Sequence, residues 1–529
     1  MLTLAEGLTP VPDEDASRTS YEIFVGSFAD SNGDGIGDLD GIAAAMDYIN
    51  DGNPATAEDL GATGIWLTPI FPSPTYHKYD ASDYTSVDPA FGTLEDFDEL
   101  LALCHERGVT LILDLAVNHT SVEHPWFKAA ADYLRQLPPD ADPVYEDCPY
   151  VWYYNFSRDP VTGYAPLSDS NWYYEARFWE GMPDMNLSTE AVREEIRSVA
   201  AFWLDRGVDG FRLDACTSYY SDQTEANVDF LTWLNSAVKE IKPEAYLVGE
   251  VWADQSVYAR YLESGIDSVF DFRFAGQEGI IAMTVKGQKG ADVYAREMAA
   301  EEELYAQMNP AYVNAPFYTN HDMARSAGYY AYDDGSRTKL AGALNLLQTG
   351  NAFIYYGEEL GMKGAGIDEN KRAPMDWTRD GESGAEALGY DEAALKALMT
   401  AGPENMESFS MKFPSLAGQT ADDESVLTYY RTAVRIRESF PVIARGRTTV
   451  LDVSGGDVCA FTRTDEDGKY APVLIAVNTS EENQWVQLGS LAEEYPKLLA
   501  VLTVSGSHLV SQSGSNVVLP PLGIAILGK

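Results

Sequence analysis

Short apolar runs that end in polar or acidic residues recur along the chain, and they limit its fold more than any other feature. Stretches with helical spacing lie between them, such as residues 93–107 and 192–206. Strands that are apolar on both faces are typical of a parallel sheet covered by helices, and alternation over about 400 residues favours a closed (β/α)8 barrel over an open sheet. The runs are YEIFVGSF (21–28), TGIWLTPIF (63–71), VTLILDLAVN (109–118), VDGFRLDA (208–215), AYLVGEVW (245–252), PFYTNHD (316–322) and AFIYYGEE (352–359).

The spacing of strand-end acids predicts an insertion. Asp114 and Asp214 end strands that should be neighbours, although 100 residues separate them, whereas Glu250 follows Asp214 by 36 residues, about one βα unit. After Phe440 the pattern changes to short alternating runs, which are typical of antiparallel strands. We therefore predict an N-terminal extension at 1–20, an α/β barrel at 21–117 and 188–440, an irregular inserted subdomain over the active face at 118–187, and an antiparallel β-sandwich at 441–529.

The charge balance excludes some classes of partner. There are 36 Lys and Arg against 83 Asp and Glu, so the net charge is −47, which would repel nucleic acids and anionic membranes. Hydrophobic residues make up 45%, too much for a disordered acidic chain. No stretch approaches the roughly 20 apolar residues of a membrane span. We expect a globular monomer.

The N-terminal sequence and the cysteines bear on the compartment. The first 20 residues lack the basic start and apolar run of a signal peptide, so the protein is either cytoplasmic or exported with its signal removed. The four cysteines are widely spaced and form no C-x-x-C pair, which argues against a zinc site. We expect buried or partly exposed thiols rather than disulfides.

Three carboxylates lie at the ends of predicted strands: Asp214 in GFRLDA, Glu250 in GEVW and Asp322 in TNHD. A barrel brings the carboxyl ends of its strands to one mouth, where mutual repulsion should raise the pKa of one acid so that it holds a proton. Retaining glycoside hydrolysis needs such a pair, a nucleophilic carboxylate and a protonated acid about 5–5.5 Å apart. The alternative is that these acids are solvated or bind a metal.

The sequence DSNGDGIGD predicts a cation site. Oxygen ligands at alternate positions suit Ca²⁺, and the glycines allow a tight turn, although Mg²⁺ and a solvated acidic turn remain alternatives. An EF-hand is excluded because its twelfth position would be Gly41 instead of Glu. The expected ligands are Asp30, Asn32, Asp34, the carbonyl of Ile36, and Asp38.

Four motifs together resemble a known family. DLAVNH (114–119), GFRLDA (210–215), GEVW (249–252) and TNHD (319–322) are similar, in order and spacing, to the four signature regions of the α-amylase family, glycoside hydrolase family 13. MPDMN (182–186) resembles a fifth signature. The resemblance runs from about Tyr21 to the C-terminal β domain. It implies a catalytic barrel and a structural cation in the loop after the first strand.

The resemblance also implies roles for the strand-end residues. Asp214 would be the nucleophile, Glu250 the general acid and then base, and Asp322 the carboxylate that stabilises the transition state. Arg212, two residues before the nucleophile, would orient Asp214 and keep it ionised, because an opposite charge lowers a carboxyl's pKa.

Further residues resemble the family's sugar contacts. His119 and His321 would hydrogen-bond the sugar at the cleavage point, and Tyr79 would stack under it, although a single Tyr can simply be packing. His77 falls where some relatives keep another polar contact. Asp368 and Arg372 would grip the adjacent sugar, with a surface salt bridge as the alternative.

A second cation site of the family is not expected here. Cys216, Thr217 and Ser218 stand where its Lys-His would be, so Asn118 is interpreted as structural and Cys216 as core packing.

The fifth signature bears on specificity within the family. MPDMN together with the cation loop resembles the intermediary subfamily between oligo-1,6-glucosidases and neopullulanases, whose members are often exported, which favours an extracellular or cell-surface location. This implies endo hydrolysis of α-1,4 bonds in starch and maltooligosaccharides, with pullulan, cyclodextrins and transglycosylation as further activities to test. Three alternatives stay open: an exo-acting α-glucosidase or oligo-1,6-glucosidase, a glucan-rearranging enzyme such as a trehalose-forming one, and a non-catalytic binding protein.

Overall fold

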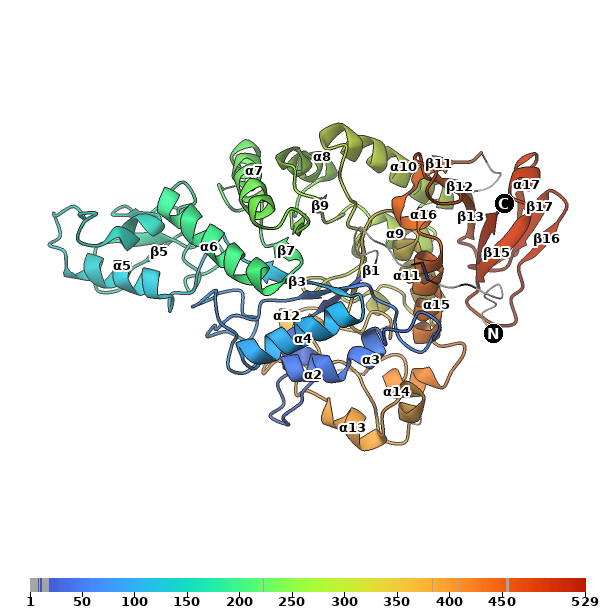
Figure 1. The fold of residues 1–529 in the computed structure, drawn as a ribbon, viewed down its shortest axis with the longest axis horizontal. Coiled ribbons are helices and arrows are strands. Elements are labelled where there is room, and N and C mark those ends of the chain that lie inside the picture. The colour runs from blue at the N-terminus through green and yellow to red at the C-terminus, as the bar shows by residue number, and fades with distance from the viewer. Residues whose placement is uncertain are drawn as a thin grey trace. The chain divides into compact units, whose positions relative to one another are not determined.

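A parallel sheet forms the centre of the catalytic fold. The computed structural model describes residues 8, 10, 11, 19–221, 223–382, 384–408, 410–452 and 456–529, without the side chains of 387 and 388. The strand order of the parallel sheet is β10-β1-β2-β3-β7-β8-β9. The strands, labelled in part in Figure 1, are β1 (Thr19–Ile23), β2 (Gly64–Leu67), β3 (Thr110–Leu115), β7 (Gly210–Leu213), β8 (Tyr246–Gly249), β9 (Ser268–Val269) and β10 (Ala352–Tyr355).

Two isolated parallel bridges complete the barrel. Phe270 pairs with Ala315, and Phe317 pairs with Phe353 of β10, so residues 315–317 take the eighth strand position. The predicted (β/α)8 barrel is thus confirmed. Six of the seven predicted runs contain named strands, whereas 316–322 provides only a bridge. The pattern did not predict β9, because two residues are too few to give a period.

Local sequence explains how β7 and the preceding helix are placed. α6 (Glu190–Arg206) ends at Gly207, whose φ of 114° is left-handed. Gly210 begins β7 beside Tyr246, and a Cβ added there would lie 1.9 Å from the Tyr246 carbonyl oxygen. Only glycine therefore allows β7 to approach β8 this closely. α4 (Leu94–Glu106) and α6 match the predicted helices.

The chain divides into two compact units. Unit 1 comprises residues 1–65, 103–110 and 270–529, and unit 2 comprises 66–102 and 111–269. The predicted domain boundaries differ from this division and stay predictions, and most of the predicted extension 1–20 lies outside the described residues. Among the described residues, the α-helices wholly in unit 1 are α1 (Val25–Phe28), α2 (Leu39–Ala44), α3 (Met46–Ile49), α9 (Ile280–Val285), α10 (Ala291–Met308), α11 (Ser336–Leu346), α12 (Asp368–Lys371), α13 (Glu392–Ala397), α14 (Leu416–Thr420), α15 (Val426–Ser439), α16 (Val442–Arg445) and α17 (Leu491–Glu494).

Residues 118–187 of unit 2 are more regular than the sequence predicted. They contain α5 (Pro125–Gln136), the 3-10 helix η1 (Pro149–Tyr153) and a sheet of order β4-β6-β5. His124 caps α5 by accepting a hydrogen bond from the Trp126 N–H, and Pro125 suits the first helical position. The strands are β4 (Phe156–Ser157), β5 (Tyr164–Pro166) and β6 (Tyr173–Glu175), and unit 2 also holds α7 (Thr224–Ile241) and α8 (Gln255–Tyr258).

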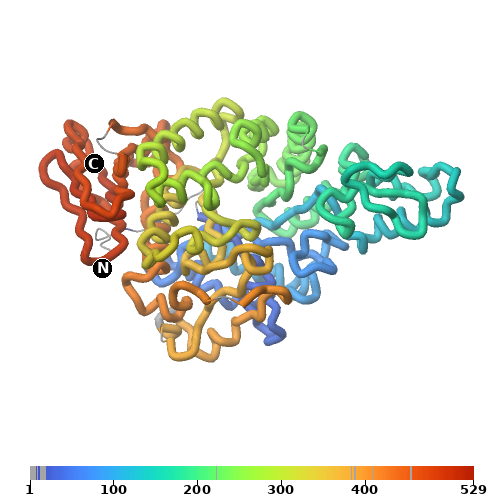
Figure 2. Tube along the Cα trace, turned by 180° about the vertical axis from the view of Figure 1, so that it is seen from behind, coloured from blue at the N-terminus to red at the C-terminus, as the bar shows by residue number. Residues whose placement is uncertain are grey.

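The C-terminal residues form the predicted antiparallel β domain. One sheet has the order β11-β12-β13-β18-β15 and the other β14-β17-β16, with Val458, Leu474, Val486 and Val517 among the buried side chains of their common core. Figures 1 and 2 show these strands as the red part of the chain. They are β11 (Arg447–Val450), β12 (Val458–Thr464), β13 (Val473–Asn478), β14 (Gln484–Gln487), β15 (Lys497–Leu502), β16 (Ser511–Ser513), β17 (Asn516–Leu519) and β18 (Ile524–Gly528).

All four cysteines are buried free thiols. Within the described residues, no helix combines the length and apolarity needed to cross a membrane.

Two buried glutamates follow β10 in unit 1. The hydroxyls of Thr319 and Tyr430 donate to Glu358, and those of Tyr21 and Tyr48 donate to Glu359. Burial, together with the neighbouring charge of Glu359, raises the pKa of Glu358 to about 8. Glu358 therefore holds its proton more tightly in the folded chain than in the unfolded one.

We predict that Glu358→Gln makes the protein less sensitive to rising pH. A raised folded pKa gives stability that is complete below the unfolded value near 4.5 and is lost as pH rises to about 8. The difference in melting temperature, variant minus wild type, should therefore become more positive as the pH rises from 5 to 8. The exposed Glu303→Gln is the control. A difference that is constant across this pH range would contradict the prediction.

Candidate active site

A buried guanidinium organises the acids of unit 2. Arg212 of β7 is 1% exposed, and its Nη1 lies 2.8 Å from Asp114 Oδ1 and 2.6 Å from Asp214 Oδ1. Its Nη2 lies 3.1 Å from Glu250 Oε2. Burial alone would lower the pKa of Arg212, but the negative charges around it, above all that of Asp114, raise it well above its usual value. One permanent cation thus contacts three acidic side chains.

Strand register brings these side chains together. Arg212 is opposite Asp114 in the β3–β7 pair, and Leu213 is opposite Gly249 in the β7–β8 pair. Because strand residues alternate between faces, Arg212 and Asp214 point to the same side. Glu250 comes directly after β8, so the parallel register places its carboxyl group at the same end of the sheet.

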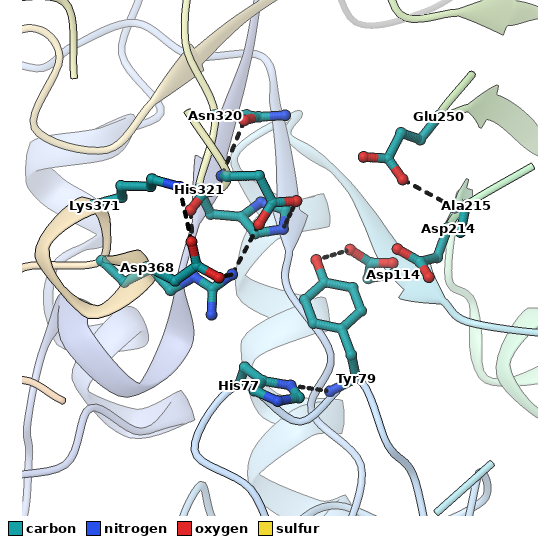
Figure 3. Close-up of polar contacts among 12 residues, drawn as sticks. His77, Tyr79, Asp114, Asp214, Ala215, Glu250, Asn320, His321, Asp368 and Lys371 are labelled. Atoms are coloured by element: carbon teal, nitrogen blue, oxygen red, sulfur yellow. Dashed lines mark hydrogen bonds and ion pairs between the residues drawn. The ribbon is translucent and has the colours of Figure 1, made fainter. Parts of the chain in front are cut away.

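A strained residue fixes the acid at position 250. Ala215 has a φ of 49°, an unfavourable conformation for a non-glycine residue, and its N–H donates to Glu250 Oε2 at 2.9 Å, as Figure 3 shows. The Glu250 N–H donates to the Leu213 carbonyl, and the Cys216 N–H donates to the Glu250 carbonyl. Backbone strain of this kind is concentrated at functional sites.

Tyr79 is anchored to the same acid cluster. Its hydroxyl donates to Asp114 Oδ2 at 2.8 Å (Figure 3), and Trp66 Nε1 lies 3.3 Å from that oxygen. The Arg212 guanidinium lies 5.7 Å from the centre of the Tyr79 ring. Tyr79, the predicted sugar platform, is therefore rigidly held and 8% exposed.

The two predicted histidines of unit 2 are close to Tyr79. His77 Nδ1 accepts a hydrogen bond from the Tyr79 N–H at 3.2 Å. His119 Nε2 lies 3.2 Å from the Tyr79 carbonyl oxygen, and burial lowers the pKa of His119. His119 is thus a neutral imidazole at pH 7 that can donate to the Tyr79 carbonyl from Nε2. The ring of Phe178 packs against His119, with ring centres 5.3 Å apart.

The fifth signature packs against the same region. Met182 forms a buried cluster with Tyr79 and Ala116. Asp184 pairs with His119 through an antiparallel bridge and accepts a hydrogen bond from Asn118 Nδ2 at 2.9 Å. Asn118 therefore has the structural contact that the sequence suggested. Burial raises the pKa of the Cys216 thiol to about 12, so this cysteine is not reactive at neutral pH.

A second cluster, in unit 1, surrounds Asp322. His321 Nδ1 lies 2.6 Å from Glu22 Oε1, and its Nε2 lies 3.3 Å from Asp322 Oδ2. Burial favours neutral His321, but the charge of Asp322 and the hydrogen bond and charge of Glu22 outweigh it and raise the pKa. The buried His321 ring therefore lies between two acidic side chains, Glu22 and Asp322.

Arg372 makes its shorter contact with Asp322 rather than with its predicted partner. Its Nη2 lies 2.8 Å from Asp322 Oδ1 but 3.7 Å from Asp368 Oδ2. Asp368 is half exposed and pairs with Lys371 Nζ at 2.7 Å (Figure 3). The Asp368–Arg372 contact exists, but Arg372 mainly positions Asp322.

Glu22 is a site residue that the motif search missed. It lies on β1, is 1% exposed and contacts both the side chain and the backbone N–H of His321. The signal was present, because Glu22 is the only charged residue in the apolar run YEIFVGSF. A charge inside a buried strand requires a partner.

The predicted cation loop has its oxygens turned toward its own backbone. Asp30 accepts from the N–H groups of Asn32, Gly33 and Gly35 at 2.7–2.9 Å. Asp38 accepts from Ser31 and Gly41, and the exposed Asp34 accepts from the Ile36 N–H. In the part of the chain that the structure describes, no group of three or more His, Cys, Asp or Glu is placed to hold a metal. The donor chemistry fits a hard cation, but this loop geometry does not.

Comparison with known proteins gives a consistent result. Residues 22–446 match the family model "Alpha amylase, catalytic domain". The solved structure of Eubacterium rectale Amy13B is 44% identical, with a TM-score of 0.91 over 98% of this chain and 97% of that one.

Two curated relatives differ in their names. Alpha-amylase 3 of Dictyoglomus thermophilum is 35% identical and covers 86% of this chain and 83% of its own length. Glucan 1,6-alpha-glucosidase of Streptococcus pneumoniae is 28% identical and covers 88% and 91%. Proteins named alpha-glucosidase also match.

We predict opposite titration shifts for the two buried histidines. NMR of protein with isotope-labelled histidine has only six side chains to resolve. His321 should titrate above 6.5 and His119 below it. Glu22→Gln should lower the pKa of His321, because it removes a facing negative charge and the hydrogen bond that accompanies it. Glu301 is also buried, and its carboxylate faces Asn314, so Glu301→Gln should leave the pKa of His321 unchanged. A His321 signal unaffected by Glu22→Gln would contradict the described role of Glu22.

Proposed function

The chain belongs to the α-amylase family of glycoside hydrolases, and from this premise we propose that it is a retaining, endo-acting enzyme on α-1,4-glucosidic bonds of starch and maltooligosaccharides. The observation that carries the proposal is the sharing of Arg212 between Asp214 and Glu250. It joins a candidate nucleophile and a candidate acid through one guanidinium.

In the first proposed step the substrate bond breaks. The Asp214 carboxylate attacks the anomeric carbon while Glu250 gives its proton to the departing glycosidic oxygen, so a glucosyl ester forms on Asp214. In the second step Glu250, now a carboxylate, takes a proton from water, which attacks the anomeric carbon and frees Asp214. Two inversions leave the product in the α configuration.

The cation in the cluster supports these roles. Arg212 Nη1 contacts Asp214 Oδ1 at 2.6 Å and so holds the carboxylate proposed as the nucleophile in one orientation. Asp114 is fully buried. It accepts hydrogen bonds from Arg212 Nη1 and from the hydroxyl of Tyr79. Asp114 therefore acts as a positioning residue for Arg212 and Tyr79.

The unit 1 cluster would serve the sugar at the cleavage point. We assign Asp322 to the carboxylate that binds the distorted sugar and stabilises positive charge at its ring. His321 and Arg372 both contact Asp322, so its two oxygens are oriented before substrate arrives.

An exo-acting enzyme is the second candidate. Relatives named glucan 1,6-alpha-glucosidase and alpha-glucosidase support it. Endo action is preferred because the relative named Alpha-amylase 3, at 35% identity, is more similar to this chain than the relatives named glucan 1,6-alpha-glucosidase and alpha-glucosidase, at 28% to 33%.

A cation in the loop at 30–38 is a further part of the proposal. Asp30, Asn32, Asp34, Asp38 and the Ile36 carbonyl would hold Ca²⁺, or Mg²⁺, after their oxygens turn from the loop amides. The oxygen-only donor set supports this, and Ca²⁺ tolerates flexible geometry better than Mg²⁺.

The product pattern tests the endo proposal. Early in the reaction, maltoheptaose should give maltooligosaccharides of several lengths. Asp214→Asn and Glu250→Gln should each lower kcat by about three orders of magnitude or more, because each removes a group that acts only in the transition state. Glucose as the only first product would contradict endo action and favour the exo alternative.

Chelation tests the cation proposal. Treatment with a chelator should lower the melting temperature, because an ion bound only to the folded state stabilises it. Ca²⁺ added back should restore it better than Mg²⁺. Asp34→Asn, at an exposed ligand position, should reduce the chelator effect. Identical melting curves with and without chelator would count against a structural ion.

A further inference from the structure

The small sheet of the C-terminal domain has a solvent-exposed face with an aromatic ring on it. Trp485 of β14 is 62% exposed, although tryptophan is usually much more buried. Its sheet has the order β14-β17-β16. In Figure 1, β16 and β17 lie on the side of the red strands away from helices α9 and α11 of the same unit.

Strand register defines which side chains share the face of Trp485. Trp485 is opposite Val518, which is opposite Ser511, and Gln487 is opposite Asn516, which is opposite Ser513. Opposite residues point to the same side, and so do residues two apart. These six side chains form what we call the Trp485 face.

The other side of the sheet is already used. Val486, Val517 and Leu519 alternate with the residues of the Trp485 face and are buried in the core of the C-terminal domain. The exposed side of Trp485 therefore cannot be explained by packing of the domain on itself.

The Trp485 face is polar but uncharged. None of its six residues is charged, in a chain in which 22% of residues are charged and the net charge is −47. Within the described residues, the side chains of Gln487, Ser511, Ser513 and Asn516 make no hydrogen bond. The face thus offers an aromatic ring surrounded by amide and hydroxyl groups that are available to a ligand.

We propose that the Trp485 face binds one or two glucosyl units of an α-glucan chain without using the catalytic residues. The ring would stack on the C–H face of a glucose, and the amides and hydroxyls would bond its hydroxyls. The choice of an α-glucan rests on the proposed function. The neutral ligand fits a face without charges.

The size of the face favours a sugar over a protein. Three strands are about 10 Å across, and residues two apart are about 7 Å apart along a strand. A stable protein interface needs about 800 Å² from each partner, with an apolar centre. One ring and one valine supply far less than this. The face would hold a long glucan near the enzyme and matter little for short substrates.

Starch binding by inactive protein tests the proposal. Migration in native gels that contain soluble starch is compared for Asp214→Asn and for Asp214→Asn with Trp485→Ala, so that the active site is the same in both. Retention by starch should fall about fivefold, which is within the range of one lost aromatic contact. Trp485→Tyr should keep most of the retention because it keeps a ring. Tyr332→Ala is the matched control, since Tyr332 is fully exposed at 104% but outside any sheet.

The outcomes separate this proposal from the proposed function. If Trp485→Ala keeps its melting temperature and its kcat/KM on maltotriose but loses starch retention, the Trp485 face binds glucan. Unchanged starch retention by Trp485→Ala, or an equal loss of retention by Tyr332→Ala, would overturn the proposal that the Trp485 face binds glucan. Hydrolysis of maltoheptaose by the wild type would still support the proposed function in that case. Loss of self-association with Trp485→Ala, without loss of starch retention, would overturn it in favour of a contact between copies. Should Trp485→Ala fold poorly, Gln487→Ala with Asn516→Ala gives the same test.

Discussion

The ion pairs of Arg212 are the interaction on which the unit 2 site depends. Three carboxylates, at positions 114, 214 and 250, lie in a largely buried setting, and a single guanidinium contacts each of them. Removing the cation from such a network leaves uncompensated buried charge, which typically costs about 3–5 kcal/mol. Gly210 and the register of β7 serve this arrangement, because they bring Arg212 opposite Asp114 and next to the end of β8. The position of Arg212 therefore depends on the fold, and the proposed chemistry depends on Arg212.

Acids near the ends of other strands are accommodated in different ways. Around Asp322 the partners are the buried imidazole ring of His321 and the guanidinium of Arg372, which orient the carboxylate and leave its side chain 32% exposed. After β10, Glu358 has no short contact with a cation among the described residues and instead receives hydroxyl hydrogen bonds and a raised pKa. The partly exposed, cation-paired acids are those with proposed chemical roles, and the fully buried protonated one serves the core.

Sequence patterns predicted most of the fold but fewer of its contacts. The barrel followed from apolar runs, because a buried parallel strand must be apolar on both faces. β9 escaped prediction because it is two residues long. α5 was missed although its buried Phe127, Ala130, Ala131 and Leu134 have the spacing of one helix face. Motif spacing placed Arg212, Asp214 and Glu250 near one another, since strand ends are local in sequence. Glu22 could not be linked to His321, because their contact spans 299 residues and depends on closure of the barrel. The pairing of Arg372 with Asp322 was missed because the two residues lie 50 positions apart and no motif joins them.

The central claim is that Asp214, held by Arg212, forms the covalent bond to the sugar. A fluorinated glucosyl fluoride, which slows the second step more than the first, should lose its anomeric fluoride and leave a fluoroglucosyl ester on the protein. Peptide mass spectrometry after acid quenching would locate it. The account predicts one added fluoroglucosyl group on the peptide that contains Asp214, and none in Asp214→Asn. An adduct on another residue, or inactivation without any adduct, would contradict it.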